Sequence, residues 1–126
     1  MPGFSRPVTF ASIDGSRSEQ AEAVIDTGSE YCLVPSDLAG RIGVVDLGVQ
    51  EVGLADGSLR ELRLAAVRVQ MQGRTRVVTA VIGPPGVEPL IGANTLGQFS
   101  FGVDPQGERL IPQIPRLLAS TNWPTW

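Results

Sequence analysis

The residues best suited to chemistry in this chain are the tripeptide Asp26-Thr27-Gly28, which follows an apolar run at 23–25 and precedes Ser29. Ending an apolar strand in a carboxylate costs free energy unless that charge is satisfied or used. Two carboxylates held a few ångströms apart can activate a water molecule. Because two like charges cannot both ionise at that distance, one carboxyl stays protonated as the acid while the other serves as base. Asp26 is therefore the candidate acid–base residue.

The composition excludes most alternatives to carboxylate chemistry. The sequence has no His, and its ten basic residues are all Arg. Without His, neither Ser–His or Cys–His nucleophiles nor His-ligated metals can be built, and without Lys there is no Schiff-base or P-loop lysine. The single cysteine, Cys32, lies in an apolar stretch, and we interpret it as a small buried residue rather than a nucleophile. No metal and no cofactor is expected.

The overall character of the sequence is that of a globular protein. Its 126 residues are 42% hydrophobic and carry a net charge of −3, which favours one domain spanning 1–126, with a core at about 7–112 and a tail at 113–126. The scattered arginines predict no nucleic-acid partner, and no apolar run approaches the ~18 residues that predict a membrane span. The lone cysteine and the lack of a signal-like N-terminal segment favour a cytoplasmic location.

The first elements that must position Asp26 are short strands. Alternation at 7–13 and the apolar run at 22–25 predict two strands around the turn Asp14-Gly15-Ser16. A further short strand is predicted at 33–35. We expect Ser36 to cap a brief helical turn after it, ended by Gly40 or Gly43.

The middle of the chain predicts a hairpin and a bulged strand. The pair Asp56-Gly57 between apolar residues is a strong hairpin signal. The apolar phase of the strand that follows slips at Ala65-Ala66, which predicts a β-bulge there. Another strand is expected at 77–82, before a proline-containing loop at 83–86.

The last third repeats the pattern of short strand and helix. Leu90-Ile91-Gly92 mirrors residues 32–35, and we expect Asn94 to cap a second short helix, followed by a hairpin around 104–107. The predicted fold class is all-β: a small, closed, barrel-like domain with one or two short helices.

These motifs together resemble the retropepsin-like aspartic proteases, the retroviral type with a single Asp-Thr-Gly, and we interpret the chain as a cellular or bacterial member. The resemblance covers roughly residues 7–112 and rests on three segments: 26–29, Leu33-Val34-Pro35 and Leu90-Ile91-Gly92. It implies a homodimer, in which a second copy supplies the other Asp26, acting on peptide or protein substrates. Departures are few: Ser29 stands where many retroviral members carry Ala, and Ala93 precedes Asn94.

The resemblance also assigns roles to the remaining site residues. Thr27 would hydrogen-bond across the dimer, Gly28 would hold the Asp26 carboxylate through its N–H, and the Ser29 hydroxyl would donate to the outer carboxylate oxygen. Leu90, Ile91 and Gly92 would pack beside the catalytic loop. The flap that covers the substrate would consist of Leu54, Ala55, Asp56, Gly57 and Ser58, with fewer glycines than the retroviral flap.

Two functions of different class remain open. The first is an aspartic endopeptidase, and the second is a non-catalytic dimerisation or peptide-binding module with the same fold. Tyr31 either lines the cleft or packs beside it, and the tail with Trp123 and Trp126 either docks on a partner or is a free end.

Overall fold

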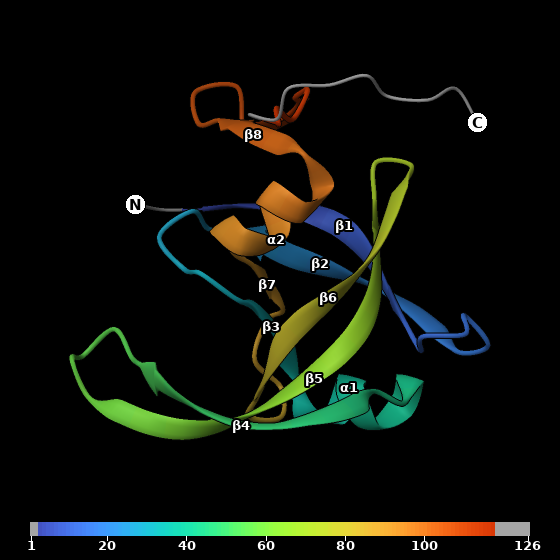
Figure 1. Ribbon diagram of the computed structural model, residues 1–126, viewed down its shortest axis with the longest axis vertical. Helices are drawn as coiled ribbons and strands as arrows, with labels where there is room; N and C mark the ends of the chain where they lie inside the picture. Colours follow the sequence, from blue (N-terminus) through green and yellow to red (C-terminus); the bar gives the residue numbers. More distant parts are fainter. Residues whose placement is uncertain (1–2, 118–126) are drawn as a thin grey trace.

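The computed structural model describes residues 3–117 of the chain (Figure 1). The expectation for Trp123 and Trp126 lies outside the described residues. The described part forms, in chain order, β1 (Phe4–Ala11), β2 (Ser18–Ile25), β3 (Cys32–Pro35), α1 (Ser36–Ile42), β4 (Val45–Gly53), β5 (Leu59–Met71), β6 (Arg74–Gly83), β7 (Leu90–Ile91), α2 (Ala93–Phe99), β8 (Phe101–Asp104) and β9 (Arg109–Pro112).

Six of these strands close into a barrel. They are hydrogen-bonded in the order β1-β2-β7-β3-β6-β5, and β5 pairs back onto β1 through residues 68–70 and 9–11. Closure leaves the six strands without a free edge. Strand β4 pairs with β5 outside this ring, and β8 with β9 forms a separate two-stranded sheet. The predicted all-β, barrel-like fold with two short helices is confirmed.

The core is built by alternation along the barrel strands. On β5 the odd-numbered side chains from Ala65 to Met71 are buried, while the even-numbered ones between them are partly or fully exposed. The largest buried side chains include Phe10 from β1, Ile25 from β2 and Phe99 from α2. The barrel interior is therefore filled by apolar side chains from strands and helices far apart in sequence.

Both helices are short, and both predicted caps are wrong. Ser36 is the first residue of α1 rather than the residue before it, and the N-cap positions are occupied by Pro35 and Gly92, without a side-chain cap hydrogen bond at either helix. Of the two glycines predicted to end the first helix, it is Gly43 that does so. It has a φ of 76°, and its N–H donates to the carbonyl of Ala39.

The bulge lies on the neighbouring strand rather than at the predicted position. The β4–β5 register shifts between Asp46 and Gly48, which leaves Leu47 as the extra residue. Strand β5 itself pairs with β6 without interruption from Leu64 to Met71. The apolar phase of β5 changes because its odd positions face the barrel interior, whereas Leu62 and Leu64 belong to the other face of the sheet.

The β4–β5 hairpin extends beyond the barrel and carries the predicted flap at its tip (Figure 1, green). We call the part of this hairpin from residue 48 to residue 64 the flap. Its tip is closed by hydrogen bonds from the N–H of Leu54 to the carbonyl of Ser58 (2.8 Å) and from the N–H of Gly57 to the carbonyl of Leu54 (2.9 Å). Gly57 has a φ of 87°, which accounts for a glycine at this position.

Candidate active site

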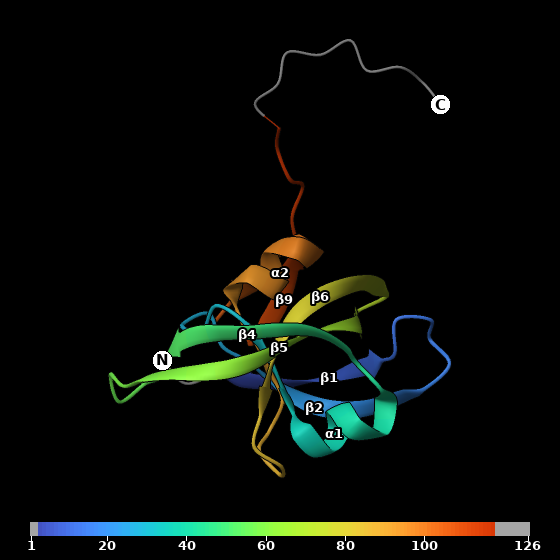
Figure 2. The same cartoon turned by 60° about the horizontal axis from the view of Figure 1, so that its bottom comes forward.

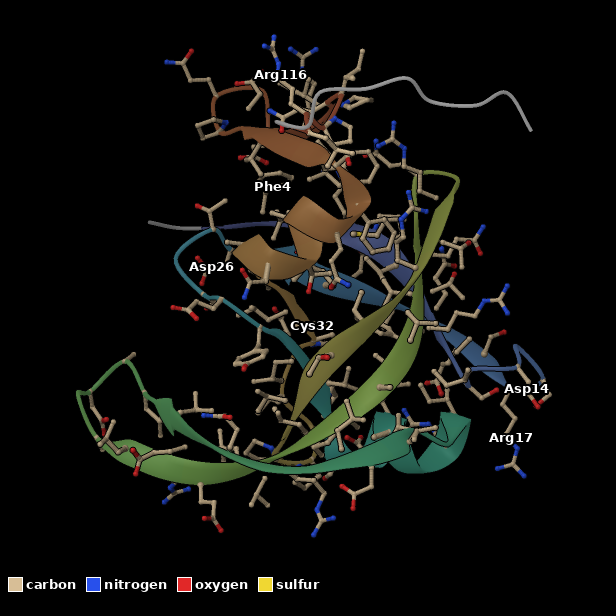
Figure 3. The ribbon with its side chains drawn as sticks, viewed as in Figure 1. Phe4, Asp14, Arg17, Asp26, Cys32 and Arg116 are labelled. Atoms are coloured by element: carbon tan, nitrogen blue, oxygen red, sulfur yellow. The ribbon has the colours of Figure 1, made fainter. Side chains whose placement is uncertain are left out.

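Asp26 stands directly after β2, where the chain leaves the barrel. Its backbone N–H donates to the carbonyl of Ile91 at 3.0 Å, continuing the parallel pairing in which Ile25 lies beside Ile91. Figure 3 shows Asp26 in the loop between β2 and β3, on the same side of the view as the flap tip. The barrel therefore fixes the start of this loop from both β2 and β7.

Both oxygens of the Asp26 carboxylate accept hydrogen bonds from the next residues. The N–H of Gly28 donates to Oδ1 at 2.9 Å, and the hydroxyl of Ser29 donates to Oδ2 at 3.3 Å. A Cβ atom at Gly28 would lie 3.2 Å from Oδ1, so this approach suits a residue without a side chain. Asp26 is half-buried and Thr27 is exposed. The local geometry thus matches the contacts expected for Gly28 and Ser29, whereas the cross-dimer bond of Thr27 is not tested by a single chain.

The loop after Asp26 lies against the start of α2. The N–H groups of Ala93 and Asn94 donate to the carbonyls of Ser29 (2.7 Å) and Glu30 (3.0 Å). These contacts satisfy N–H groups that a helix start otherwise leaves without partners, so Asn94 has no capping role to perform. A Cβ atom at Gly92 would lie 2.6 Å from the Ser29 carbonyl oxygen, which requires a glycine beneath this loop. Residues 90–92 thus lie beside the loop, at the position expected from the sequence.

A row of apolar side chains runs across five strands on the face opposite the barrel core. Register pairs Val24 with Leu90, Leu90 with Leu33, Leu33 with Val81, and Val81 with Leu64. Directly paired residues project from the same face of a sheet, so these five side chains form one continuous band. All but Val81 are half-buried. We call this band the apolar row. It begins two residues before Asp26, and sequence reasoning found only Leu33 and Leu90 in it.

The underside of the flap continues this row. Strands β4 and β5 pair in regular register from Gly48 and Leu64 outward, so the pairs at 50/62 and 52/60 face the same side as the row. Val52 and Leu62 are half-buried there, whereas Glu51 and Glu61 are exposed on the opposite face. Figure 1 shows the hairpin curving with its concave side towards the barrel. The flap therefore places Val52 and Leu62, together with the polar Gln50 and Arg60, on the side that continues the row.

The flap tip is held by a side chain as well as by backbone. Oδ1 of Asp56 accepts from the N–H of Ser58 at 2.9 Å and from its hydroxyl at 2.6 Å. The Ser58 hydroxyl and N–H lower the pKa of Asp56 below its usual range. Asp56 is thus a turn former, as expected from its position.

The other aspartates predicted to be turn formers also accept hydrogen bonds within their own turns. Asp14 accepts from the hydroxyl of Ser12 (2.8 Å) and from the N–H of Ser16 (2.9 Å). Asp104 accepts from the N–H of Gly107 and pairs with Arg109 at 3.0 Å. Neither contact involves the loop of Asp26.

Cys32 is fully buried in β3, and burial raises the pKa of its thiol to about 12. A thiol in that state is not a nucleophile near neutral pH, which agrees with its interpretation as a core residue. Within residues 3–117 no cluster of three or more His, Cys, Asp or Glu side chains is placed to hold a metal ion, and no helix there is long and apolar enough to cross a membrane.

The two hollows described on the surface lie away from Asp26. One of about 470 Å³ and one of about 360 Å³ follow the seam between β1 and β5, and both are bordered by Thr9 and Gln70. Asp26 lines neither of them.

Comparison with known proteins supports the fold rather than a close relative. No family model matches the sequence, and no curated protein matches it. Among solved structures, the EIAV protease in complex with an inhibitor is 14% identical, with a TM-score of 0.60 over 76% of this chain and 86% of that one. A retropepsin-like aspartic protease from Rickettsia conorii is 15% identical, with a TM-score of 0.56 over 81% and 76% of the two chains.

A third similar structure is the retroviral protease-like domain of Ddi1 from Leishmania major. It is 16% identical, with a TM-score of 0.55 over 91% of this chain and 96% of that one. The fold is therefore the retropepsin-like fold, as the sequence motifs predict. At these identities the likeness establishes the fold alone.

Proposed function

We propose that this chain is an aspartic endopeptidase that works as a homodimer, with one Asp26 from each copy. The observation that carries the proposal is the setting of Asp26. Its carboxylate is held by Gly28 and Ser29, two residues after the Val24 end of the apolar row, in a retropepsin-like fold. A half-buried carboxylate held next to an apolar surface in this way is suited to acid–base chemistry.

The mechanism requires a second carboxylate, and a two-fold axis beside the Asp26 loop would supply it. In such a dimer each copy presents the same surface to the other, so the two loops meet symmetrically. Thr27 is exposed in one chain, and we propose that it becomes part of this contact. One of the two carboxyl groups then serves as the acid and the other as the base.

Peptide hydrolysis would proceed through a water molecule held between the two carboxyl groups. The ionised carboxylate takes a proton from the water, and the water oxygen bonds to the peptide carbonyl carbon. At the same time, the protonated carboxyl donates its proton to the carbonyl oxygen. The C–N bond then breaks as the carboxyl that took the water proton donates it to the nitrogen. One hydroxyl of the tetrahedral intermediate gives its proton to the other carboxylate, which restores the singly protonated pair. Gly28 N–H and Ser29 Oγ keep each carboxylate oriented throughout.

The substrate class follows from the surface around Asp26. We propose that an extended peptide lies between the apolar row and the flap underside, where apolar side chains of the peptide are removed from water by Leu33, Leu90 and Leu62. Burial of apolar area of this kind contributes roughly 25 cal/mol per Å². Extended peptides are commonly bound as an added strand, which suits a flap made of two β-strands.

The second candidate function is a dimerisation or peptide-binding module without catalysis. A binding module would need the apolar row and the flap but not an ionisable group at position 26. The hydrogen bonds made to Asp26 by Gly28 and Ser29 favour the enzyme, because these donors support an ionised carboxylate.

The test is cleavage of a peptide library near pH 5 by the purified protein, with and without a pepstatin-type inhibitor, alongside Asp26→Asn. The amide is nearly the same shape but cannot exchange the proton, so we expect cleavage to be lost while the folded dimer remains. Asp14→Asn, which changes an exposed aspartate in a distant turn, is the matched control and should cleave like the wild type. Cleavage by Asp26→Asn at a comparable rate would contradict the proposal.

A further inference from the structure

The loop at residues 84–89, between β6 and β7, begins and ends at the apolar row. At its start, a Cβ atom on Gly83 would lie 2.8 Å from Cδ2 of Leu33, so the backbone here lies against that side chain. At its end, Pro89 accepts a hydrogen bond from the N–H of Val24 at 2.9 Å and is followed by Leu90. The position of this loop therefore affects the positions of Leu33, Val24 and Leu90 in the row.

The loop itself has little regular structure to hold it. Pro84 and Pro85 have no N–H to donate, and Gly86 has a φ of 81°. Between its two ends, the loop is bound to another element by one hydrogen bond among the described residues. The N–H of Gly86 donates to Oδ1 of Asp37 at 3.2 Å. Asp37 lies 49 residues earlier, in the first turn of α1.

Asp37 is in turn part of a chain of charged groups. Its Oδ2 lies 3.6 Å from Nη1 of Arg41, one turn along α1. Arg41 forms a bidentate ion pair with Glu19 of β2, donating from Nε at 2.8 Å and from Nη2 at 2.9 Å. The chain Glu19–Arg41–Asp37–Gly86 thus links a barrel strand, a helix and the loop. Figure 2 shows the loop reaching towards the start of α1.

The electrostatics of the chain favour its charged state. The N–H of Gly86 is the largest cause that lowers the pKa of Asp37, and the hydrogen bond from Arg41 lowers the pKa of Glu19. Both shifts favour the ionised form of these carboxylates. The side chains of Glu19, Arg41 and Asp37 are 37–54% exposed, so each ion pair alone contributes little stability. The role of this series of charged groups is to fix the position of the loop.

We propose that Asp37 is a positioning residue for the apolar row, the proposed peptide-binding surface. It is not a member of the row and touches no substrate, but by holding Gly86 it sets the position of the loop and, through the loop, the position of Leu90. This inference rests on the proposed function for its effect on catalysis. Its effect on the loop does not depend on that function.

The experiment compares Asp37→Ala with Asp37→Asn and with Arg41→Ala, using hydrogen exchange at the Gly86 amide and the methyl resonances of Leu90. Loss of the acceptor in Asp37→Ala should speed exchange at Gly86 about 3- to 10-fold and shift the Leu90 methyls. Asp37→Asn keeps an acceptor oxygen, so its exchange rate at Gly86 and its Leu90 methyl shifts should stay close to those of the wild type. Arg41→Ala leaves the Gly86 bond in place and should change exchange less than Asp37→Ala.

Peptide cleavage gives the second readout. If the inference is right, KM rises about 3- to 10-fold in Asp37→Ala with kcat within about twofold, while the melting temperature changes little. Unchanged exchange at Gly86, or faster exchange with an unmoved Leu90, overturns the inference. If the wild type cleaves no peptide, the proposed function fails, and the Gly86 and Leu90 measurements still decide whether Asp37 positions the loop.

Discussion

Gly92 lies against Tyr31 with no space for a side chain, since a Cβ atom at position 92 would be 2.5 Å from the Tyr31 carbonyl oxygen. The atom would meet backbone, which cannot move aside like the end of a flexible side chain. This contact joins the start of α2 to the loop that carries Asp26. The shape of the candidate active site therefore depends on a glycine that is 66 residues away from Asp26 in sequence (92 minus 26).

Gly92→Ala is expected to displace the Asp26 loop. Overpacking of this kind typically lowers the free energy of unfolding by about 1–3 kcal/mol. Displacement of the carboxylate should also lower the cleavage rate of the protein that remains folded. Thermal unfolding and cleavage rates measure the two effects. Gly97→Ala is the control in the same helix, because a Cβ atom at position 97 would meet nothing within 4 Å. Equal effects of the two substitutions would contradict the packing argument.

Ser29→Ala removes the hydroxyl that donates to Oδ2 of Asp26. A donor to the ionised form of a carboxyl group favours that form, so its loss should move the pH optimum of kcat/KM upward by a fraction of a pH unit or more. The measurement is the pH profile of kcat/KM, expected to be bell-shaped and on the acid side of neutrality in the wild type. Ser36→Ala, at a serine that makes no cap hydrogen bond, should leave the profile unchanged. An unchanged profile in Ser29→Ala means that the hydroxyl has another role.

Asp14 gives a stability prediction with a defined pH window. The N–H of Ser16 is the largest cause that lowers the pKa of Asp14 from 3.8 to about 2. Because the folded-state value is the lower one, the stabilisation is complete above pH 3.8 and is lost as the pH falls towards 2. Urea unfolding of wild type and Asp14→Asn should therefore differ most above pH 4 and converge near pH 2. A difference that stays constant over this range would contradict the assignment.

Local turn chemistry explains why much of the fold could be predicted from sequence. Asp14-Gly15, Asp56-Gly57 and Gly43 determine chain reversals or a helix end through their own backbone and side-chain preferences. The strand that delivers Asp26 and its contacts with the next three residues are equally local. These features need no knowledge of the rest of the chain.

The features that escaped prediction depend on partners far away in sequence. Asn94 makes no cap because carbonyls of the Asp26 loop already accept from the start of α2. The change of apolar phase predicts a bulge in β5, but its cause is a change in which face of the strand is covered, and the extra residue is Leu47 on β4. The full apolar row and the bond from Gly86 to Asp37 likewise arise only when distant strands are brought together.

The most direct test of the central claim is to refold wild type together with Asp26→Asn and to measure cleavage at constant total protein. If each site needs Asp26 from two chains, an equal mixture contains about one quarter wild-type dimers, so activity should fall to about one quarter of that of the unmixed wild type. Activity of about one half, which follows the amount of wild-type chain, would show that each chain acts alone, and activity of about three quarters would show that one Asp26 per dimer suffices. Either result would contradict the shared site.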